Sequence, residues 1–339
     1  SAIRSLAPLL TKPCLVVGKS TVPVGTAKWI SEYLVANAPA GDDVHLVWNP
    51  EFLREGFAVQ DTLHPDRIVL GVTNNSDVEV IREIYASALA DNTPLVVTDF
   101  ATAELVKVAA NAFLATKISF INAFADLADV VGADIGTLAD AIGYDTRIGR
   151  KFLNAGIGFG GGCLPKDIRA FMARAEELGA SQAVEFLKEI DAINLRARQR
   201  IIELVRKDLS DDLQGKKVAI LGAAFKPDSD DVRDSPALDI AAQIQAAGAT
   251  VTVHDPKAIA NAQKRFPALN FADDVNTTLK DAEIVLHLTE WKIYREIDPV
   301  KVKSIVKNPI VIDGRNALDR ELWQSAGWKF RALGRSHNE

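Results

Sequence analysis

The sequence predicts an α/β protein with two Rossmann-like domains, joined by a long central helix and a helical connecting region. Three observations support this prediction. Short apolar runs typical of strands alternate with helical patterns in the first 99 residues, the same alternation returns after residue 210, and a continuous helical pattern lies between them. We therefore expect a partial Rossmann-like domain over residues 1–99, a central helical domain over 100–209 and a second Rossmann-like domain over 210–339.

The composition excludes several classes of protein. The 339 residues carry 39 Lys and Arg against 45 Asp and Glu, a net charge of −6, which argues against a nucleic-acid binder. Only two cysteines are present, Cys14 and Cys163, so we expect a reducing compartment and a cytoplasmic protein. No run of 18 apolar residues lacks a charge, and the first residues lack the order of a signal peptide, so we expect no membrane association.

In the first region we expect strands at residues 13–18, 44–48, 67–72 and 95–98, with helices at 26–36 and 77–90. A dinucleotide-binding domain normally opens with a strand that leads into G-x-G-x-x-G and a helix. Nothing before Cys14 resembles this arrangement. We therefore expect that the first strands of this domain are missing and that the chain is a truncated form.

The central region is predicted to be helical. Residues 101–131 form one unbroken pattern that is apolar over much of its surface, which fits either a core helix within the chain or a subunit contact. Shorter helices are expected at 134–142, 167–178 and 182–209.

The second α/β region is expected to have strands at 217–221, 250–253, 284–288 and 310–312, and a helix at 236–247. Gly222 follows the first strand and Asp255 follows the second, which is the layout of a nucleotide-binding sheet. Many α/β domains share this layout, so it is a weak signal by itself.

The strongest local motif is GFGGGCLPKD at residues 158–167. Four glycines in five residues allow the backbone to approach a ligand closely, and Pro165 suits the first turn of a helix. Cys163 therefore lies at a helix N-terminus next to Lys166, where a thiolate is favoured, and we interpret it as a nucleophile. Asp167 is either a partner of this thiol or a simple helix-capping residue. Cys14 is interpreted as a core residue of a strand.

A second constellation lies on the long helix. Glu104, Lys107 and Asn111 are spaced to share one face, where an ammonium beside an amide could stabilise an oxyanion. The alternative is a solvated polar stripe. Polar segments at residues 19–23, 49–56 and 225–234 each fit either a ligand-binding turn or a plain surface loop. The five histidines lack metal-site spacing, so no metal is expected.

Taken together, these motifs resemble the UDP-glucose/GDP-mannose dehydrogenase family of nucleotide-sugar dehydrogenases. The resemblance rests on motifs in one order: KSTVPVGT (19–26), NPEFLREG (49–56), AELVKVAANAF (103–113), GFGGGCLPKD (158–167), FKPDSDDVRDS (225–235), TEW (289–291) and DGRN (313–316). Several such motifs in the right order are far more specific than any one of them alone.

The resemblance implies oxidation of a primary alcohol to a carboxylate with two NAD, through a thiohemiacetal and a thioester on Cys163. It implies that Lys107 and Asn111 stabilise oxyanions, with Lys107 as a possible proton acceptor. Asp167 and Thr21 would hold and activate a water, and Glu51 would be the base for thioester hydrolysis. Residues implied to touch NAD are Thr21, Glu55, Lys166 and Arg233.

The sugar nucleotide is implied to contact a larger set of residues: Glu51, Phe52, Leu53, Lys107, Asn111, Phe152, Leu153, Asn154, Ala155, Gly156, Gly160, Lys226 and Arg315. Arg147 is implied to reach the site of a neighbouring subunit, with the long helix as the core of a homo-oligomer. The NPEFLREG, GFGGGC and HPDRIVLG segments favour UDP-glucose as substrate over GDP-mannose.

Other functions stay open at this point. They are oxidation of GDP-mannose or another nucleotide sugar, a non-catalytic sugar-nucleotide-binding fragment, and a 3-hydroxyacid-type dehydrogenase, which shares a Lys-x-x-x-Asn helix but needs no cysteine. The absent glycine fingerprint leaves open whether this chain binds NAD and turns over.

Overall fold

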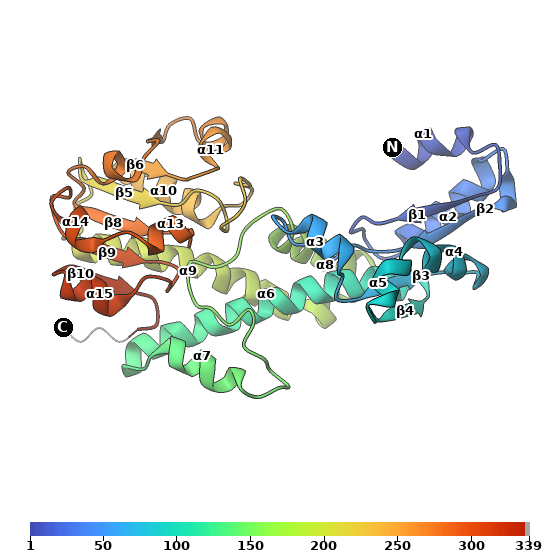
Figure 1. The fold of residues 1–339 in the computed structure, drawn as a ribbon, viewed down its shortest axis with the longest axis horizontal. Coiled ribbons are helices and arrows are strands. Elements are labelled where there is room, and N and C mark those ends of the chain that lie inside the picture. Colours follow the sequence, from blue (N-terminus) through green and yellow to red (C-terminus); the bar gives the residue numbers. More distant parts are fainter. Residues whose placement is uncertain (336–339) are drawn as a thin grey trace. The chain divides into compact units, whose positions relative to one another are not determined.

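A computed structural model describes residues 1–335 of the chain (Figure 1). These residues form two compact units. The first comprises Ser1–Ala112 and Asp167–Ala183, and the second comprises Phe113–Lys166 together with the residues from Val184 onward. Both units are α/β, as the sequence predicts.

The first unit is built on a four-stranded sheet in the order β1-β2-β3-β4. The strands are β1 (Cys14–Gly18), β2 (Val44–Trp48), β3 (Ile68–Gly71) and β4 (Leu95–Thr98), all at the predicted positions. β1 pairs with β2 and β3 pairs with β4 in parallel, whereas β2 and β3 are antiparallel where Trp48 faces Gly71. The antiparallel junction was not predicted, because a strand's pattern of apolar residues does not encode the direction of its neighbour.

Helices cover both faces of this sheet. Leu46, Val69 and Leu34 belong to one apolar cluster, which α2 (Thr26–Asn37) completes. Val47 and Leu70 belong to a second cluster with Ile81 of α4 (Ser76–Ile84). Since alternate residues of a strand point to opposite faces, the two helices pack on opposite sides.

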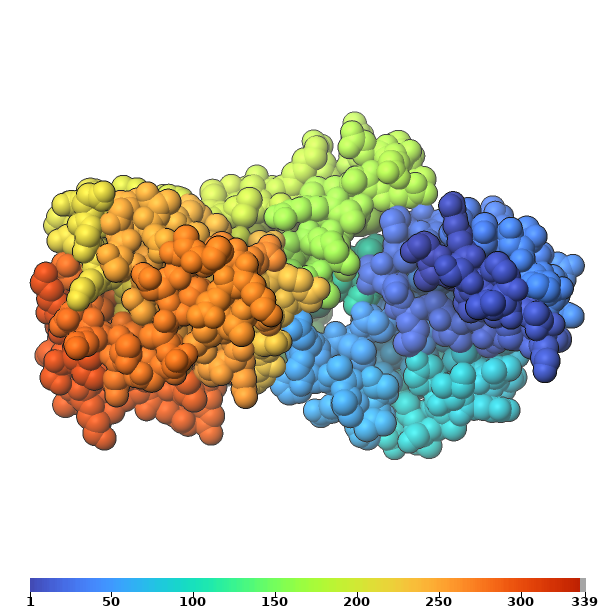
Figure 2. Space-filling model, turned by 90° about the horizontal axis from the view of Figure 1, so that it is seen from above, coloured from blue at the N-terminus to red at the C-terminus, as the bar shows by residue number. Residues whose placement is uncertain are grey.

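Smaller elements complete the first unit. They are α1 (Ala2–Leu6), a 3₁₀ helix (Ala7–Leu9), a second 3₁₀ helix (Gly41–Asp43), α3 (Ala58–Leu63), α5 (Ala86–Ala90) and a third 3₁₀ helix (Ser181–Val184). The N-terminal segment lies on the outside of the unit, as Figure 2 shows in dark blue. The helix predicted at 77–90 is wrong as a single element, since the backbone of Tyr85 leaves the helical region and separates α4 from α5.

The central helix α6 (Phe100–Val131) confirms the unbroken pattern, and its residues contribute to both units. By length and composition it is the one helix of the described residues that could cross a membrane. Within the second unit, however, Ser119 donates a hydrogen bond to the Ile190 carbonyl, and Asn122 accepts one from the Gly156 backbone. These buried contacts are those of a core helix in a folded protein.

The second unit contains a fully parallel six-stranded sheet in the order β10-β9-β8-β5-β6-β7. The strands are β5 (Lys217–Leu221), β6 (Thr250–His254), β7 (Asn270–Phe271), β8 (Ile284–His287), β9 (Ile310–Asp313) and β10 (Lys329–Ala332). Chain order reverses on either side of β5, so the carboxyl ends of β5 and β8 form the switch point where ligands bind in such sheets. The sequence predicted four of these strands and missed β7 and β10 at the two edges.

Helices of the second unit are α7 (Ile135–Gly143), α9 (Phe186–Asp208), α10 (Pro236–Ala246), α11 (Ile259–Arg265), α12 (Val275–Leu279), α13 (Lys292–Arg295), α14 (Pro299–Lys303) and α15 (Arg320–Ser325). α8 (Leu164–Glu177) begins at the end of the glycine-rich segment and continues into the first unit. The large core cluster lies around β5, β6 and β8, whose inner residues are almost completely buried.

Candidate active site

The predicted face of α6 is buried rather than solvated. Glu104, Lys107 and Asn111 expose 2%, 6% and 8% of their surface, which excludes the polar-stripe alternative. Each of these side chains has a polar partner within the first unit. Buried polar groups require such partners, because burial removes their contacts with water.

Lys107 is paired with Glu51. The Nζ atom of Lys107 lies 3.6 Å from Glu51 Oε1, and it lies 5.4 Å from the centre of the Phe52 ring. The other carboxylate oxygen of Glu51 accepts a hydrogen bond of 2.6 Å from the backbone N–H of Leu53. The NPEFLREG loop thus fixes its carboxylate against the ammonium of α6, and a fixed, desolvated ammonium of this kind can stabilise a developing oxyanion.

Asn111 contacts Asp167. Its side-chain amide donates a hydrogen bond of 2.6 Å to Asp167 Oδ2, and Asp167 exposes only 4% of its surface in the first turn of α8. An acidic residue in the first turn of a helix also interacts favourably with the helix dipole. The structure therefore gives Asp167 a specific partner in addition to the capping position.

Glu51 and Phe52 line a pocket of about 290 Å³ within the first unit. Its walls come from the ends of β1 and β2, the loop after β2, α3 and the start of β3, and they include Lys19, Asn49, Leu53, Asp61, Arg67 and Tyr85. Arg54 and Asp61 form a forked pair that fastens this loop to α3. The Arg67 guanidinium stacks 3.8 Å from the centre of the Phe52 ring.

Lys19, Asn49 and Tyr85 form a polar cluster in the pocket wall. Lys19 Nζ donates to Asn49 Oδ1 at 2.7 Å and contacts the Tyr85 hydroxyl at 2.8 Å, and that hydroxyl also donates to Asn49 Oδ1 at 2.7 Å. Tyr85 is a site residue that the sequence does not predict. Its position inside a predicted helix gave no sign that it would reach the ends of β1 and β2.

The glycine-rich segment is held in the second unit by Asn194 of α9. This side chain accepts a hydrogen bond from the Phe159 N–H and donates one to the Phe159 carbonyl. Gly158 adopts φ +86°, and a Cβ atom there would lie 2.2 Å from Asn194 Oδ1. A Cβ at Gly160 would lie 2.2 Å from the Asp234 carbonyl. Close backbone packing, not only access for a ligand, therefore requires glycine here.

Cys163 is exposed and directly precedes α8. A nucleophile must be reachable, and the exposed position of Cys163 meets this requirement. Cys14 is half-buried in β1. The catalytic role of Cys163 stays a prediction.

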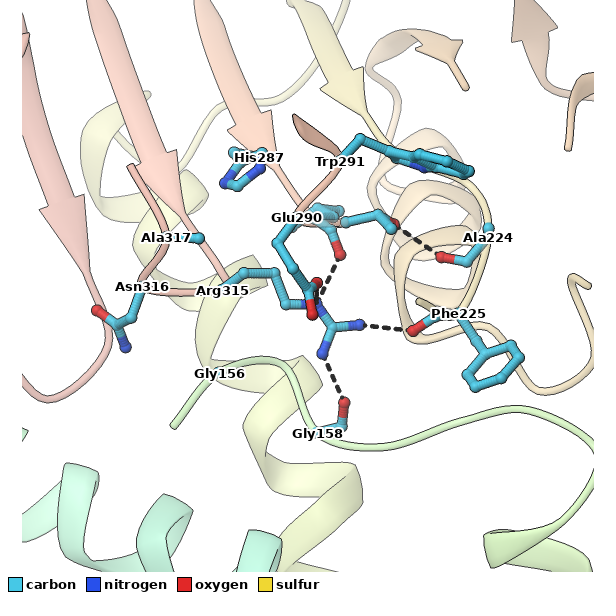
Figure 3. Close-up of polar contacts among 12 residues, drawn as sticks. Gly156, Gly158, Ala224, Phe225, His287, Glu290, Trp291, Arg315, Asn316 and Ala317 are labelled. Carbon is cyan, nitrogen blue, oxygen red and sulfur yellow. Dashed lines mark hydrogen bonds and ion pairs between the residues drawn. The ribbon is translucent and has the colours of Figure 1, made fainter. Parts of the chain in front are cut away.

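Arg315, in the loop after β9, connects the loops after β5 and β8 with the glycine-rich segment. Its guanidinium donates hydrogen bonds to the backbone carbonyls of Leu288, Gly158 and Phe225 at 2.9, 2.9 and 3.0 Å, and Figure 3 shows it between the last two. Glu290 forms an ion pair with it at 3.3 Å. Burial lowers the pKa of Arg315. In this structure Arg315 organises the loops; its contact with a sugar nucleotide stays a prediction.

Asp255, which follows β6, is also occupied by contacts within the unit. One of its carboxylate oxygens accepts hydrogen bonds from the backbone N–H groups of Ala223 and Ala224 and from Trp291 Nε1. Asp255 therefore fastens the turn after β5 to the end of β6.

The other predicted residues are distributed as follows. Phe152 has φ +66° and is 41% exposed, Leu153 and Ala155 are buried, Asn154 accepts from Arg150, and Gly156 donates to Asn122. Arg147 pairs with Asp145, Arg233 pairs with Asp231, and Lys226 lies over the Phe225 ring. Thr21 and Glu55 are half-buried, and Lys166 is exposed. The structure thus brings together Glu51 with Lys107 and Asn111 with Asp167.

The loop between β1 and α2 contains the features of the first unit that bear on dinucleotide binding. The N-terminus of α2 is the usual place for a dinucleotide phosphate in such a fold. Here the Glu104 carboxylate accepts hydrogen bonds from the backbone N–H groups of Gly25 and Ala27 at this terminus. The loop after β1 instead carries the hydroxyl-bearing residues Ser20 and Thr21, and hydroxyls can both donate to and accept from the ribose and polar parts of a dinucleotide.

Comparisons with known proteins agree with this arrangement. Three models of the UDP-glucose/GDP-mannose dehydrogenase family match the chain: the NAD binding domain at residues 1–89, the central domain at 101–196 and the UDP binding domain at 219–320. UDP-glucose 6-dehydrogenase TuaD of Bacillus subtilis (strain 168) is 40% identical over 95% of this chain and 68% of that protein. UDP-glucose 6-dehydrogenase of Rhizobium meliloti (strain 1021) is 40% identical over 99% of this chain and 76% of that protein.

A solved structure, that of a UDP-glucose dehydrogenase from the hyperthermophilic archaeon Pyrobaculum islandicum, resembles the whole chain. The TM-score is 0.87 at 34% identity, covering 98% of this chain and 73% of that one. From the three matched domains and these relatives, we conclude that the chain belongs to the UDP-glucose/GDP-mannose dehydrogenase family.

Proposed function

We propose that this chain catalyses the NAD-dependent oxidation of UDP-glucose to UDP-glucuronate in two successive hydride transfers. The observation that carries the proposal is the ion pair between the buried Lys107 and the partly exposed Glu51, and Glu51 lines a pocket in the unit that contains the family's NAD binding domain. The proposed substrate follows the names of relatives that are 40% identical. NAD supplies the hydride acceptor when it is bound, and Thr21, Glu55, Lys166 and Arg233 are the residues proposed to hold it.

In the first oxidation the C6 alcohol loses a hydride from its carbon and a proton from its oxygen, and so becomes an aldehyde. The amine of Lys107 is proposed to take part in this proton transfer, and its charge with the amide of Asn111 stabilises the oxygen as negative charge develops. Buried side chains suit this role, because water would otherwise weaken the interaction.

The second oxidation requires a covalent step. The Cys163 thiolate adds to the aldehyde carbon to form a thiohemiacetal, and loss of a second hydride leaves a thioester. Water, held by Thr21 and Asp167 and deprotonated by Glu51, attacks the thioester carbon. The C–S bond breaks, and the carboxylate and free thiol are released.

The sugar nucleotide is proposed to bind the second unit, which contains the family's UDP binding domain. Residues 152–156, Gly160, Lys226 and Arg315 are proposed to hold it. Arg147, in an exposed loop with Asp145, is proposed to contact the site of a neighbouring subunit.

We also propose a homo-oligomer formed through α6. Large apolar side chains on the part of α6 in the second unit are exposed, among them Phe113 (66%), Leu127 (53%) and Val130 (83%). Exposed apolar clusters of this kind are typical of subunit contacts. Loss of oligomerisation in Phe113→Glu, measured by light scattering, tests this proposal. A cytoplasmic location and the three-domain division at residues 99 and 209 likewise stay predictions.

The assay that tests the activity measures NADH formed from UDP-glucose and from GDP-mannose side by side. Two NADH per UDP-glucose support the proposal. One NADH per substrate indicates a simple alcohol dehydrogenase. Faster NADH formation from GDP-mannose than from UDP-glucose indicates that GDP-mannose is the substrate. Binding without turnover indicates a sugar-nucleotide-binding module.

A further inference from the structure

Glu104 is the one residue of the polar face of α6 that the proposed reaction does not use. It lies one turn before Lys107 on this helix, and 2% of its surface is exposed. Its two carboxylate oxygens accept hydrogen bonds from the backbone N–H groups of Gly25, at 2.7 Å, and Ala27, at 2.6 Å. Each oxygen of this buried carboxylate therefore accepts a hydrogen bond from the backbone at the start of α2.

This contact replaces the cap that α2 lacks. The helix begins at Thr26 after Gly25, which has φ +95° and no side chain to accept a hydrogen bond, and the first turn contains no acidic residue. Free N–H groups and the positive end of the dipole attract a negative charge at such a terminus. Glu104 supplies this charge from a helix 77 residues away in the chain.

A second side chain fastens the same loop. Arg174 of α8 donates a hydrogen bond of 3.0 Å from Nε to the Val24 carbonyl. α8 also carries Asp167, which accepts the hydrogen bond from Asn111. The loop at residues 19–25 is thus tied to both helices that carry proposed site residues of the first unit.

We propose that Glu104 is a positioning residue: it holds the loop that carries Thr21 in register with Lys107 on α6. This inference rests on the proposed function, because that function gives Thr21 its role with NAD and water. Glu104 acts through the backbone of the loop. Small displacements of reacting groups reduce catalytic rates steeply, so the fastening affects turnover more than stability.

The test compares Glu104→Gln with Asp99→Asn. Asp99 caps the N-terminus of α6 by accepting the Thr102 N–H at 2.9 Å and does not contact the β1–α2 loop. Both variants remove one helix-capping charge from the first unit. The Gln variant keeps the size of the side chain but turns an N–H₂ group towards one of the two loop N–H groups.

We expect Glu104→Gln to lower kcat by a factor on the order of 10 to 100 and to raise the KM for NAD, while the KM for UDP-glucose stays within about twofold. We expect Asp99→Asn to leave these constants unchanged. Hydrogen exchange at Gly25 and Ala27 should become at least about 10-fold faster in Glu104→Gln only. If this variant does not fold, Glu104→Asp keeps the charge but shortens its reach, and the same changes are expected in milder form.

Unchanged exchange at Gly25 and Ala27, or equal losses of kcat in the Gln and Asn variants, would overturn the inference. If the wild-type protein forms no NADH from UDP-glucose, the proposed function fails. The exchange measurement still decides whether Glu104 holds the loop, so the two failures are distinguishable.

Discussion

The side-chain amide of Asn111 donates a hydrogen bond of 2.6 Å to the carboxylate of Asp167, and both residues are buried. The contact joins α6 to α8 within the first unit. An amide opposite a carboxylate places one charge at this buried contact, whereas two carboxylates there would place two like charges side by side.

Asn111→Asp tests this relationship through pH. Two carboxylates at hydrogen-bond distance cannot both ionise, so the pKa of the pair rises in the folded variant. A raised pKa means that the folded state binds more protons than the unfolded state above pH 4. We therefore expect the variant to lose stability relative to wild type as the pH rises from 5 to 8, by about 2 kcal/mol, as measured by thermal unfolding at both values.

The double variant Asn111→Asp/Asp167→Asn, in which the two residue types are swapped, serves as the control. It restores one amide and one carboxylate at this contact, so its pH dependence should return to that of wild type. If the stability of Asn111→Asp alone depended on pH as that of wild type does, the two side chains would not share a buried contact.

Lys107→Ala should reduce the rate more than the affinity. The Lys107 ammonium is buried and held in place by Glu51, and such a fixed charge stabilises a developing oxyanion, so kcat should fall by about 10²- to 10³-fold, or about 3–4 kcal/mol. Steady-state kinetics of NADH formation measure this effect. Lys28→Ala on α2, where the side chain is exposed, is the matched control and should be neutral. A change in KM without a change in kcat would contradict the role given to Lys107.

The sequence predicts those features of the site that depend on residues close together in the chain, and not the contacts between distant ones. The spacing of Lys107 and Asn111 places them on one face of α6, since helical periodicity is local. Their partners are distant in the sequence: Glu51 precedes Lys107 by 56 residues, and Asp167 follows Asn111 by 56 residues. Only the resemblance to a family indicated catalytic roles for Glu51 and Asp167, because the local sequence around each residue does not show which distant residue it contacts.

The fold shows the same limit. β5, β6 and β8 are buried on both faces and appear in the sequence as apolar runs, so they were predicted. β7 has two residues, and β10 carries Lys329 and Arg331, so neither edge strand shows such a run. The place of Asp255 after β6 fits the layout of a nucleotide-binding sheet, but the sequence does not show that its partners are N–H groups of another turn.

Cys163→Ser should abolish net oxidation of UDP-glucose. A serine hydroxyl at neutral pH is a far weaker nucleophile than a thiolate and forms no thioester, so steady turnover should fall by at least about 10³-fold. Cys14→Ser, in the half-buried β1, is the control and should retain turnover. Production of NADH at the wild-type steady rate by Cys163→Ser would remove the covalent step from the mechanism.

Asp208 at the end of α9 should make the second unit sensitive to acid. Its side chain is fully buried between Lys329 at 2.7 Å and Arg331 at 2.7 Å, both on β10. Burial opposes the charge on Asp208, but hydrogen bonds from Arg331 and Lys329 outweigh it and lower its pKa. The folded state therefore binds fewer protons than the unfolded state. The stabilisation is present above the unfolded pKa of about 3.9 and is lost as the pH falls through the lower folded pKa.

We expect Asp208→Asn to lower the free energy of unfolding by about 2 kcal/mol at pH 7, because it weakens charged hydrogen bonds to two cations. The difference from wild type should shrink when urea denaturation is repeated at pH 3.5, where Asp208 of the unfolded protein is protonated. Asp281→Asn removes an exposed pair with Lys217 and should cost less than about 1 kcal/mol at either pH. An Asp208→Asn difference that is equal at pH 7 and pH 3.5 would show that this carboxylate does not anchor β10 to α9 through its charge.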